Sequence, residues 1–216
     1  SKFSVAEGNQ NFSSPEDSNV LMQGTKLILG LNRAIIPAGT TIIGSEAFIN
    51  CTGINDIAVP EGVTTIEGGA FAWSSLSDID LPSTLTTIEN DAFAGCTDLE
   101  SFTLPKSVVS YGDGSEDGLG ALKDCISLRS IKVEEGNSKY DSRDNCNAII
   151  ETATNTLVSG CKSTVIPNTV TIIGHQAFRG INLRDFEIPN GITTIGERAF
   201  WSSSLTSVKI PSSVTK

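Results

Sequence analysis

The sequence predicts a mainly β solenoid built from short stacked coils, and three observations support this prediction. Prolines recur every 22 or 23 residues, with one interruption of 62 residues. The same apolar residues recur at fixed distances after these prolines, and 20 Gly and 8 Pro among 216 residues favour turns over long helices. Such a period is typical of proteins in which each unit buries its apolar face only against its neighbours. The prolines that set the period are Pro37, Pro60, Pro82, Pro105, Pro167, Pro189 and Pro211.

Residues 1–36 do not follow the period and are expected to form an irregular unit. Two apolar pairs, Val20-Leu21 and Leu27-Ile28, flank a short polar stretch, which is typical of a β-hairpin. We therefore expect a hairpin here in place of a regular coil.

Residues 37–133 are expected to form regular coils in which three positions after each proline pack inside. The sixth position is Ile or Tyr, the eleventh is Phe or Leu, and the tenth is always Ala, which suits a tight turn over the core. An acidic, Gly-rich insertion at 112–120 lengthens the fourth coil. In all coils, the sixth positions are Ile43, Ile66, Ile88, Tyr111, Ile173 and Ile195, and the eleventh positions are Phe48, Phe71, Phe93, Leu122, Phe178 and Phe200.

Residues 134–166 are expected to form a second hairpin unit, because they repeat the pattern of the first. Both segments contain Glu-Gly-Asn, then an aromatic residue, Phe12 or Tyr140, and a closing Ile-Pro, with a gap of two residues between the copies. Regular coils resume over 167–216, so one continuous domain, 1–216, is the simplest interpretation.

A short strand is predicted directly before each proline, where apolar and polar residues alternate. Leu99, Phe102 and Leu104 show this pattern ahead of Pro105. A proline just after a strand removes no ladder hydrogen bond from it. We expect one such strand per coil and a continuous sheet of six strands, about 25 Å or more in length at ~4.8 Å per strand.

The outward positions of these strands form a candidate binding face that changes from acidic to mixed charge along the solenoid. Extended faces of this kind are the usual docking surfaces of repeat proteins, although a merely solvated face would show the same pattern. The candidate binding residues are Asp56, Asp78, Asp80, Glu100, Arg129, Lys132, Arg184, Asp185, Glu187 and Lys209.

Five cysteines cannot all pair within one chain. Cys51, Cys96 and Cys125 each follow a core Phe or Leu by three residues and accompany a longer corner, so we interpret them as small buried fillers. Cys146 and Cys161 could form a disulfide across the second hairpin, but an apolar residue takes the place of Cys161 in the first unit, which favours free thiols.

Charge and composition exclude several functions. A net charge of −10 disfavours nucleic acid and anionic membranes as partners, and no apolar stretch is long enough to span a bilayer. The single histidine, His175, lies in a variable surface slot, and no nucleophile, base and orienting group occur together, so no catalytic residue and no cofactor are expected. Asp113, Glu116 and Asp117 lack the spacing of a calcium loop, so no metal site is expected.

The repeat I-P-x-x-V-T-x-I-G-x-x-A-F-x-x-C-x-x-L-x-x-I-x-I resembles the BspA-like leucine-rich repeat family of bacterial surface proteins. The segment N-x-x-Y-D-S-R-x-N-C-N-A-I-I-E-T-A-T-N-T-L-V-x-G-C-K also looks like a recurring unit of that family, so the resemblance covers nearly the whole chain. It implies a curved right-handed leucine-rich-repeat solenoid, export to the cell surface, and binding of host matrix or other proteins. The motif residues of the family are structural, so no catalytic residue carries over.

We therefore expect a non-enzymatic binding or adhesion module of an extracellular or cell-surface bacterial protein. Its expected partner is a host or bacterial surface protein or a matrix protein. Glycan binding through Trp73 or Trp201 is one alternative, although packing over the corner that follows the core Phe is the favoured role for both side chains. A passive spacer within a larger surface protein is the other alternative.

Overall fold

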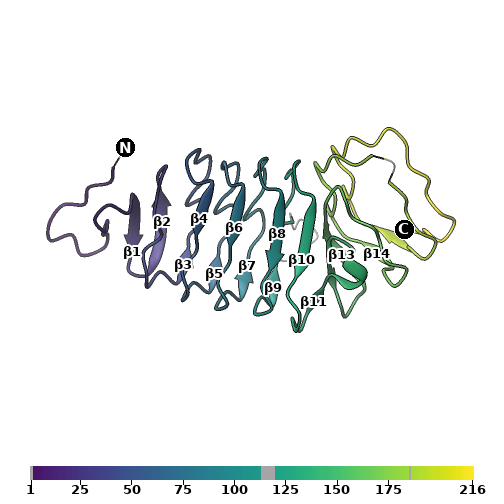
Figure 1. Cartoon of the computed structure of the whole chain (residues 1–216), viewed down its shortest axis with the longest axis horizontal. Helices are drawn as coiled ribbons and strands as arrows, with labels where there is room; N and C mark the ends of the chain where they lie inside the picture. The colour runs from purple at the N-terminus through teal and green to yellow at the C-terminus, as the bar shows by residue number, and fades with distance from the viewer. Residues whose placement is uncertain (1, 113–119, 185) are drawn as a thin grey trace.

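The computed structural model describes residues 2–112, 120–184 and 186–216, which form a stack of short coils along one axis (Figure 1). Parallel strands of successive coils pair along the stack, and the longest sheet has the order β1-β2-β3-β5-β7-β9. Ile43 pairs with Leu27 on one side and with Ile66 on the other, so equivalent residues stay in register. The strands of this sheet are β1 (Val20–Gln23), β2 (Lys26–Gly30), β3 (Ile42–Ile43), β5 (Thr65–Ile66), β7 (Thr87–Ile88) and β9 (Ser110–Tyr111). The predicted mainly β solenoid is confirmed.

The strands predicted before the prolines form a second row, as two separate pairs. β4 (Asp56–Ala58) pairs with β6 (Asp78–Asp80), and β8 (Ser101–Leu104) pairs with β10 (Ser130–Val133), in both cases parallel. The prediction of one strand per coil is therefore wrong, because each of these coils also contributes a two-residue strand to the long sheet. A strand such as Thr65–Ile66 is too short to show alternation in the sequence.

The predicted continuous sheet of six strands is also wrong, because β4-β6 and β8-β10 are separate sheets and the described residues before Pro189 and Pro211 form no strand. On one side, the backbone N–H of Val165 in the second hairpin unit already donates to the Cys146 carbonyl at 3.1 Å, so it is not available to a neighbouring strand. On the other side, the segments before the two prolines stand apart across a hollow of about 790 Å³. A ladder cannot form across such a gap.

Both hairpins occur where they were predicted, and they share one geometry. β1 pairs antiparallel with β2, and β12 (Ala148–Glu151) pairs antiparallel with β13 (Thr156–Gly160), each with one register irregularity. The second hairpin leads a sheet of order β11-β12-β13-β14-β15, with β11 (Tyr140–Asp141), β14 (Ile172–Ile173) and β15 (Thr194–Ile195). One 3-10 turn, η1 (Arg143–Asn145), precedes β12.

Stacked phenylalanine rings fill the interior. Phe48, Phe71 and Phe93 are fully buried, with ring centroids 5.1 and 5.5 Å apart and nearly parallel planes. Phe178 and Phe200 stack at 5.5 Å in the last coils, but Phe200 is only half-buried, because no further described coil covers it. The predicted inside positions are thus confirmed for the inner coils, including Tyr111 and Leu122 of the lengthened coil.

Each hairpin docks onto the next coil through a glycine. The backbone N–H of Gly30 donates to the carbonyl of Ala47 at 2.7 Å, and that of Gly160 donates to Ala177 at 2.8 Å. A methyl group at Gly30 would overlap the buried ring of Phe48, and the ring of Phe178 occupies the same place beside Gly160. The bare glycine therefore lets the hairpin approach the aromatic stack.

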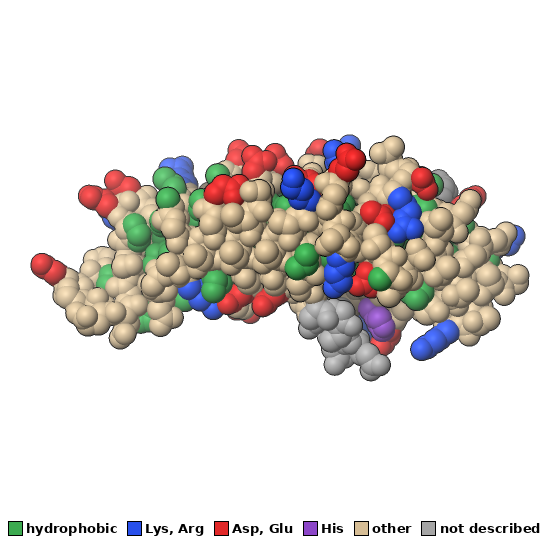
Figure 2. All heavy atoms as spheres, turned by 90° about the horizontal axis from the view of Figure 1, so that it is seen from below, with side chains coloured by type: hydrophobic (Ala, Val, Ile, Leu, Met, Phe, Trp, Pro, Cys, Tyr) green, Lys and Arg blue, Asp and Glu red, His purple; other side chains and the backbone are tan. Residues whose placement is uncertain are grey.

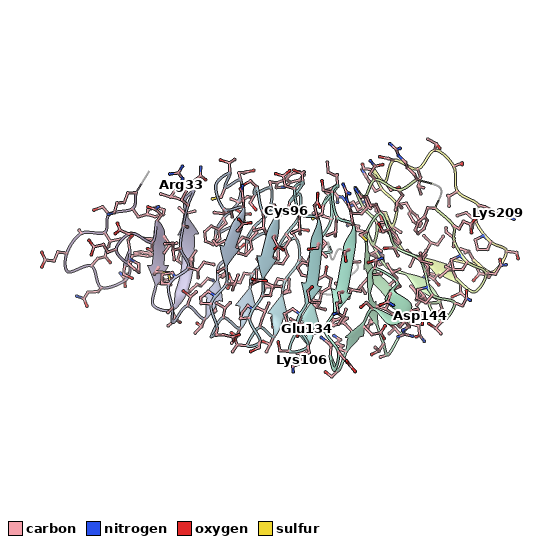
Figure 3. The ribbon with its side chains drawn as sticks, viewed as in Figure 1. Arg33, Cys96, Lys106, Glu134, Asp144 and Lys209 are labelled. Carbon is pink, nitrogen blue, oxygen red and sulfur yellow. The ribbon has the colours of Figure 1, made fainter. Side chains whose placement is uncertain are left out.

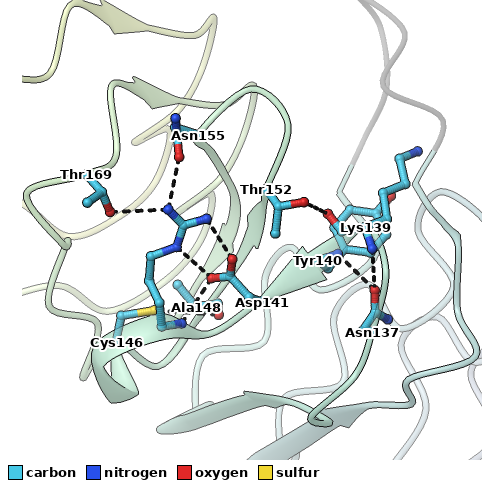
Figure 4. A network of polar contacts seen from close by, with 10 residues as sticks. Asn137, Lys139, Tyr140, Asp141, Cys146, Ala148, Thr152, Asn155 and Thr169 are labelled. Carbon is cyan, nitrogen blue, oxygen red and sulfur yellow. Dashed lines mark hydrogen bonds and ion pairs between the residues drawn. The ribbon is translucent and has the colours of Figure 1, made fainter.

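The second hairpin unit is held by an arginine clamp that the first unit lacks (Figure 4). The guanidinium of Arg143 donates to both carboxylate oxygens of Asp141, at 2.8 and 2.6 Å. Its remaining nitrogen donates to Asn155 at 2.9 Å and to Thr169 at 3.3 Å, which joins the hairpin to the following coil. These donors are engaged within the fold, so the clamp is a structural element.

Asp141→Asn is expected to remove part of the acid sensitivity of this protein. Burial raises the pKa of Asp141, but hydrogen bonds from Arg143 outweigh burial and hold the pKa below its ordinary value. The stability contributed by this lowered pKa is fully present above the ordinary pKa and is lost as the pH falls through the lowered one. Urea midpoints should therefore differ between wild type and variant at neutral pH and converge in acid. A difference that does not change with pH would contradict this assignment.

The cysteines are buried and unpaired, as predicted. The thiols of Cys96 and Cys125 each donate at 3.2 Å to a carbonyl of the preceding coil, that of Phe71 and Phe93 respectively. Cys146 and Cys161 are also free, so the alternative disulfide is not formed.

We expect slow reaction of native protein with a thiol reagent. Burial raises the pKa of Cys96 and of Cys146 to about 11, so few thiolates form near neutral pH, and the sulfur atoms are shielded. Absorbance of released thionitrobenzoate in native and in urea-unfolded protein measures this difference. Rapid labelling of Cys51 or Cys96 without denaturant would contradict the assignment as fillers.

Candidate binding surface

The strand face consists of the outward positions of β4, β6, β8 and β10 and the equivalent positions of the last two coils. Its first part is acidic. In β4 and β6 the outer residues are exposed and the middle residue is buried, so Asp56, Asp78 and Asp80 project into solvent. The parallel register places Asp56 beside Asp78. Because like charges at paired positions repel each other, these aspartates favour a cationic partner.

The second part of the strand face is mixed in charge. The backbone N–H of Arg129 donates to the carbonyl of Glu100 at 2.8 Å, so these two residues lie on adjacent coils at the same height. Lys132 lies in β10 beside Thr103 of β8 and is exposed. The strand face thus changes from acidic to partly basic between β6 and β10.

Arg184, Glu187 and Lys209 lie beyond the second hairpin unit and are separated from the other candidates. Lys209 is at the C-terminal end of the stack, opposite the end where Arg33 lies (Figure 3). The three side chains line the hollow of about 790 Å³ between the last two coils. Asp185 lies outside the described residues. The structure therefore divides the predicted face into two groups.

The described candidate residues share one electrostatic property. Each is exposed, and none forms an ion pair with another described residue. In the view from below, charged side chains of both signs follow the upper edge of the stack, with small groups of hydrophobic side chains between them (Figure 2). Exposed charge without an ion-pair partner among the described residues is thus what these candidates offer a binding partner.

Two exposed aliphatic residues on this face were not among the candidates. Ile35 is 65% exposed and Val165 is 73% exposed, and they occupy the same position in the two hairpin units, two residues before a proline. Regular coils carry a small or polar residue at that position, namely Ala58, Asp80, Thr103, Glu187 and Lys209. An aliphatic residue at an outward position is the sequence feature that could have identified these two sites. Hollows of about 470 and 420 Å³ lie beside these two sites, at the step from each hairpin unit to the next coil.

The two tryptophans both pack and remain exposed. Trp73 lies against Gly95 of the next coil, where an added methyl group would overlap the indole, yet 53% of its surface is accessible. Trp201, also 53% exposed, has the guanidinium groups of Arg198 and Arg179 at 5.0 and 6.0 Å from its ring centroid. The predicted packing over the corner therefore covers only part of each tryptophan side chain.

The remaining predicted features add no chemical site. His175 is exposed, as predicted for a variable slot. Asp113, Glu116 and Asp117 lie outside the described residues. Within the described ranges, no three His, Cys, Asp or Glu side chains are grouped so that they could hold a metal ion. No helix in the described part of the chain has the length and apolar character needed to span a membrane.

Stacked coils of 22 or 23 residues with inward aliphatic and aromatic rows define a leucine-rich-repeat protein. The profile of the BspA type leucine rich repeat region matches this chain in six copies, over residues 28–149 and 157–216. The chain belongs to this family, which confirms the resemblance noted in the sequence.

Solved structures of other leucine-rich-repeat proteins are similar to this one. A leucine-rich repeat protein from Eubacterium ventriosum is 25% identical with a TM-score of 0.62, and the match covers 83% of this chain and 54% of that one. The pneumococcal vaccine antigen PcpA is 18% identical with a TM-score of 0.52, covering 94% and 71%. A leucine rich cell surface protein from Faecalibacterium prausnitzii is 21% identical with a TM-score of 0.48, covering 90% and 79%. This chain thus spans about half of the Eubacterium protein. No match is found among curated proteins.

Proposed function

We propose that this chain is a non-enzymatic binding module of a secreted or surface-exposed bacterial protein, and that the strand face binds another protein. The carrying observation is that Asp56, Asp78, Asp80, Glu100, Arg129 and Lys132 are exposed and free of ion pairs with other described residues, on or directly before strands backed by a buried core. Charges arranged in this way steer a complementary partner and contribute to specificity. Family membership supports the same assignment.

The partner that fits the strand face is a host or bacterial surface protein, or a matrix protein, with separate basic and acidic regions. Its basic region would lie over Asp56, Asp78 and Asp80, and its acidic region over Arg129 and Lys132. Because these contacts are exposed, binding should weaken as salt increases.

The test is a panel of purified matrix proteins immobilised for surface plasmon resonance, with charge reversal as the probe. Lys132→Glu is expected to weaken the binding of any ligand found by roughly tenfold, mainly by slowing association. Lys216→Glu is the matched control, because Lys216 is also exposed but lies beside β15, away from β10, where its carbonyl accepts from the backbone N–H of Ile195 at 2.9 Å. Equal affinities of the two variants for that ligand would refute the strand face as its docking surface.

Glycan binding is the second candidate, supported by the exposed indoles of Trp73 and Trp201. Aromatic faces of this kind can stack on sugar rings, and a stacked ligand shifts tryptophan fluorescence. A panel of host glycans that leaves the emission of this protein unchanged would remove this candidate. If the chain binds neither proteins nor glycans, it acts as a spacer.

A further inference from the structure

The two hairpin units share a turn that is identical in its hydrogen bonds. The side-chain oxygen of Asn9 accepts from the backbone N–H groups of Asn11 and Phe12, at 2.9 Å each. In the second unit, the side-chain oxygen of Asn137 accepts from those of Lys139 and Tyr140, at 2.9 and 2.8 Å. The antiparallel bridge of Ser13 with Met22 likewise matches that of Asp141 with Ile150. The first unit therefore has the local structure of the second.

In the second unit, this turn holds the preceding regular coil. The amide nitrogen of Asn137 donates to the carbonyls of Pro105 and Val108, at 3.0 and 2.9 Å. Both carbonyls belong to the turn that opens that coil, in which Val108 donates back to Pro105. The backbone N–H of Val133, at the end of the coil, donates to the hydroxyl of Ser142 at 2.9 Å. Asn137 and Ser142 thus hydrogen-bond the preceding coil to the second hairpin unit.

Other side chains of the second unit also contact this preceding coil. Tyr140 is only 4% exposed, its ring lies 6.1 Å from that of Tyr111 in an edge contact, and its hydroxyl accepts from the Tyr111 backbone N–H at 3.2 Å. Ser159 is buried and its hydroxyl lies 3.0 Å from that of Tyr111. Ile149 belongs to the same buried cluster as the coil.

In the first unit the corresponding groups are uncovered. Asn9 is exposed, and its amide nitrogen has no hydrogen bond to any other described residue. Phe12, which corresponds to Tyr140, is 38% exposed, and Leu29, which corresponds to Ser159, is also exposed. Leu21, in place of Ile149, is half-buried. The surface is more apolar than its buried counterpart, yet it faces solvent.

We propose that this face, made of Asn9, Phe12, Leu21 and Leu29, is a docking site for a regular leucine-rich-repeat coil joined directly ahead of Val5. The coil would offer Asn9 the two carbonyls of a Pro-x-x-Val turn and would cover the three apolar side chains. The occupant is inferred from the same chain, since Pro105, Val108, Tyr111 and Val133 of the preceding coil contact the equivalent face of the second unit. This interaction does not depend on the strand face.

The experiment compares matched Asn→Asp substitutions in two chains. Aspartate keeps the oxygen that accepts from the backbone but replaces the donating amide with a carboxylate, which repels the carbonyls. The first chain is the protein of 216 residues. The second carries a copy of residues 82–132 directly ahead of Val5, in place of residues 1–4, so that a coil precedes both units.

In the protein of 216 residues, Asn137→Asp is expected to lower the unfolding midpoint by roughly 2–4 °C, and Asn9→Asp should leave it unchanged. In the extended chain, the two substitutions should lower the midpoint by similar amounts. A third chain, with Gly-Ser inserted between the copy and Val5, displaces the turn from Asn9, and there Asn9→Asp should again be silent.

Three results would overturn the proposal. The extended chain could fail to unfold cooperatively, or Asn9→Asp could be silent in it while Asn137→Asp is not. The third result comes from sedimentation of the protein of 216 residues. Self-association that Asn9→Asp abolishes would mean that the face takes the end of a second copy rather than a coil of its own chain.

Discussion

Phe93→Ala is expected to lower the free energy of unfolding by about 3–5 kcal/mol, which would make it one of the two most damaging single substitutions in this protein. The ring of Phe93 is fully buried between a parallel neighbour, Phe71 at 5.5 Å, and an edge-on neighbour, Phe102 at 5.4 Å. Truncation removes the contacts of the ring with both neighbours and leaves a cavity that closely packed coils on either side cannot close. Urea unfolding followed by circular dichroism measures the change.

The matched control is Phe200→Ala, at the half-exposed end of the other aromatic stack. Phe200 occupies the same position of its coil and also has one stacked and one edge-on ring neighbour, Phe178 and Phe186, but it is only half-buried, so the loss should be clearly smaller. A stability of the Phe93 variant near that of the wild type would refute the interior stack of rings.

Gly160→Ala is expected to destabilise the protein by about 3 kcal/mol or more, at or above the upper end of typical overpacking costs. The added methyl group would overlap the ring of Phe178, which is fully buried and has no space to retreat. Backbone conformation is not the cause, because φ of Gly160 is not positive. The expected loss is therefore purely steric, and the same calorimetric or urea measurement applies.

Gly120→Ala serves as the control, since a methyl group there makes only ordinary contacts with the described residues, at 3.7 Å or more. A second check is the pair Gly160→Ala with Phe178→Leu. Because the smaller side chain relieves the overlap, the double variant should lose less than the sum of the two single losses. Strict additivity would show that glycine is required for some other reason.

Most of the fold could be predicted from the sequence because every coil buries the same kinds of residue at the same positions. Ile66, Phe71 and Ala70 recur at fixed distances from a proline, and a stack of coils is the arrangement that buries all such rows at once. The two-residue strands of the long sheet could not be predicted, because residues such as Thr65–Ile66 form a strand only through their neighbours at Ile43 and Ile88. Pairing partners, and not local pattern, decide these strands.

The candidate surface was predictable only where the coils are regular. Alternation around Ile57 and Ile79 correctly places Asp56, Asp78 and Asp80 in solvent. The same alternation recurs before Pro189 and Pro211, but the described residues there form no ladder, since pairing also requires a neighbouring coil with free backbone groups. The sequence pattern of one coil does not show whether the neighbouring coil has backbone groups free to pair with it.

The second hairpin unit has a consequence for how the protein opens. Along β12, Ile149 belongs to the buried cluster of the coils before it, whereas Ala148 and Ile150 belong to the cluster of the coils after it. Strand β12 thus contributes side chains to two hydrophobic cores. When one core opens, the other can still protect the backbone hydrogen bonds of β12. Amide protons of β12 should consequently exchange with deuterium more slowly than those of the flanking coils, and the chain should lose its two halves in separate opening events.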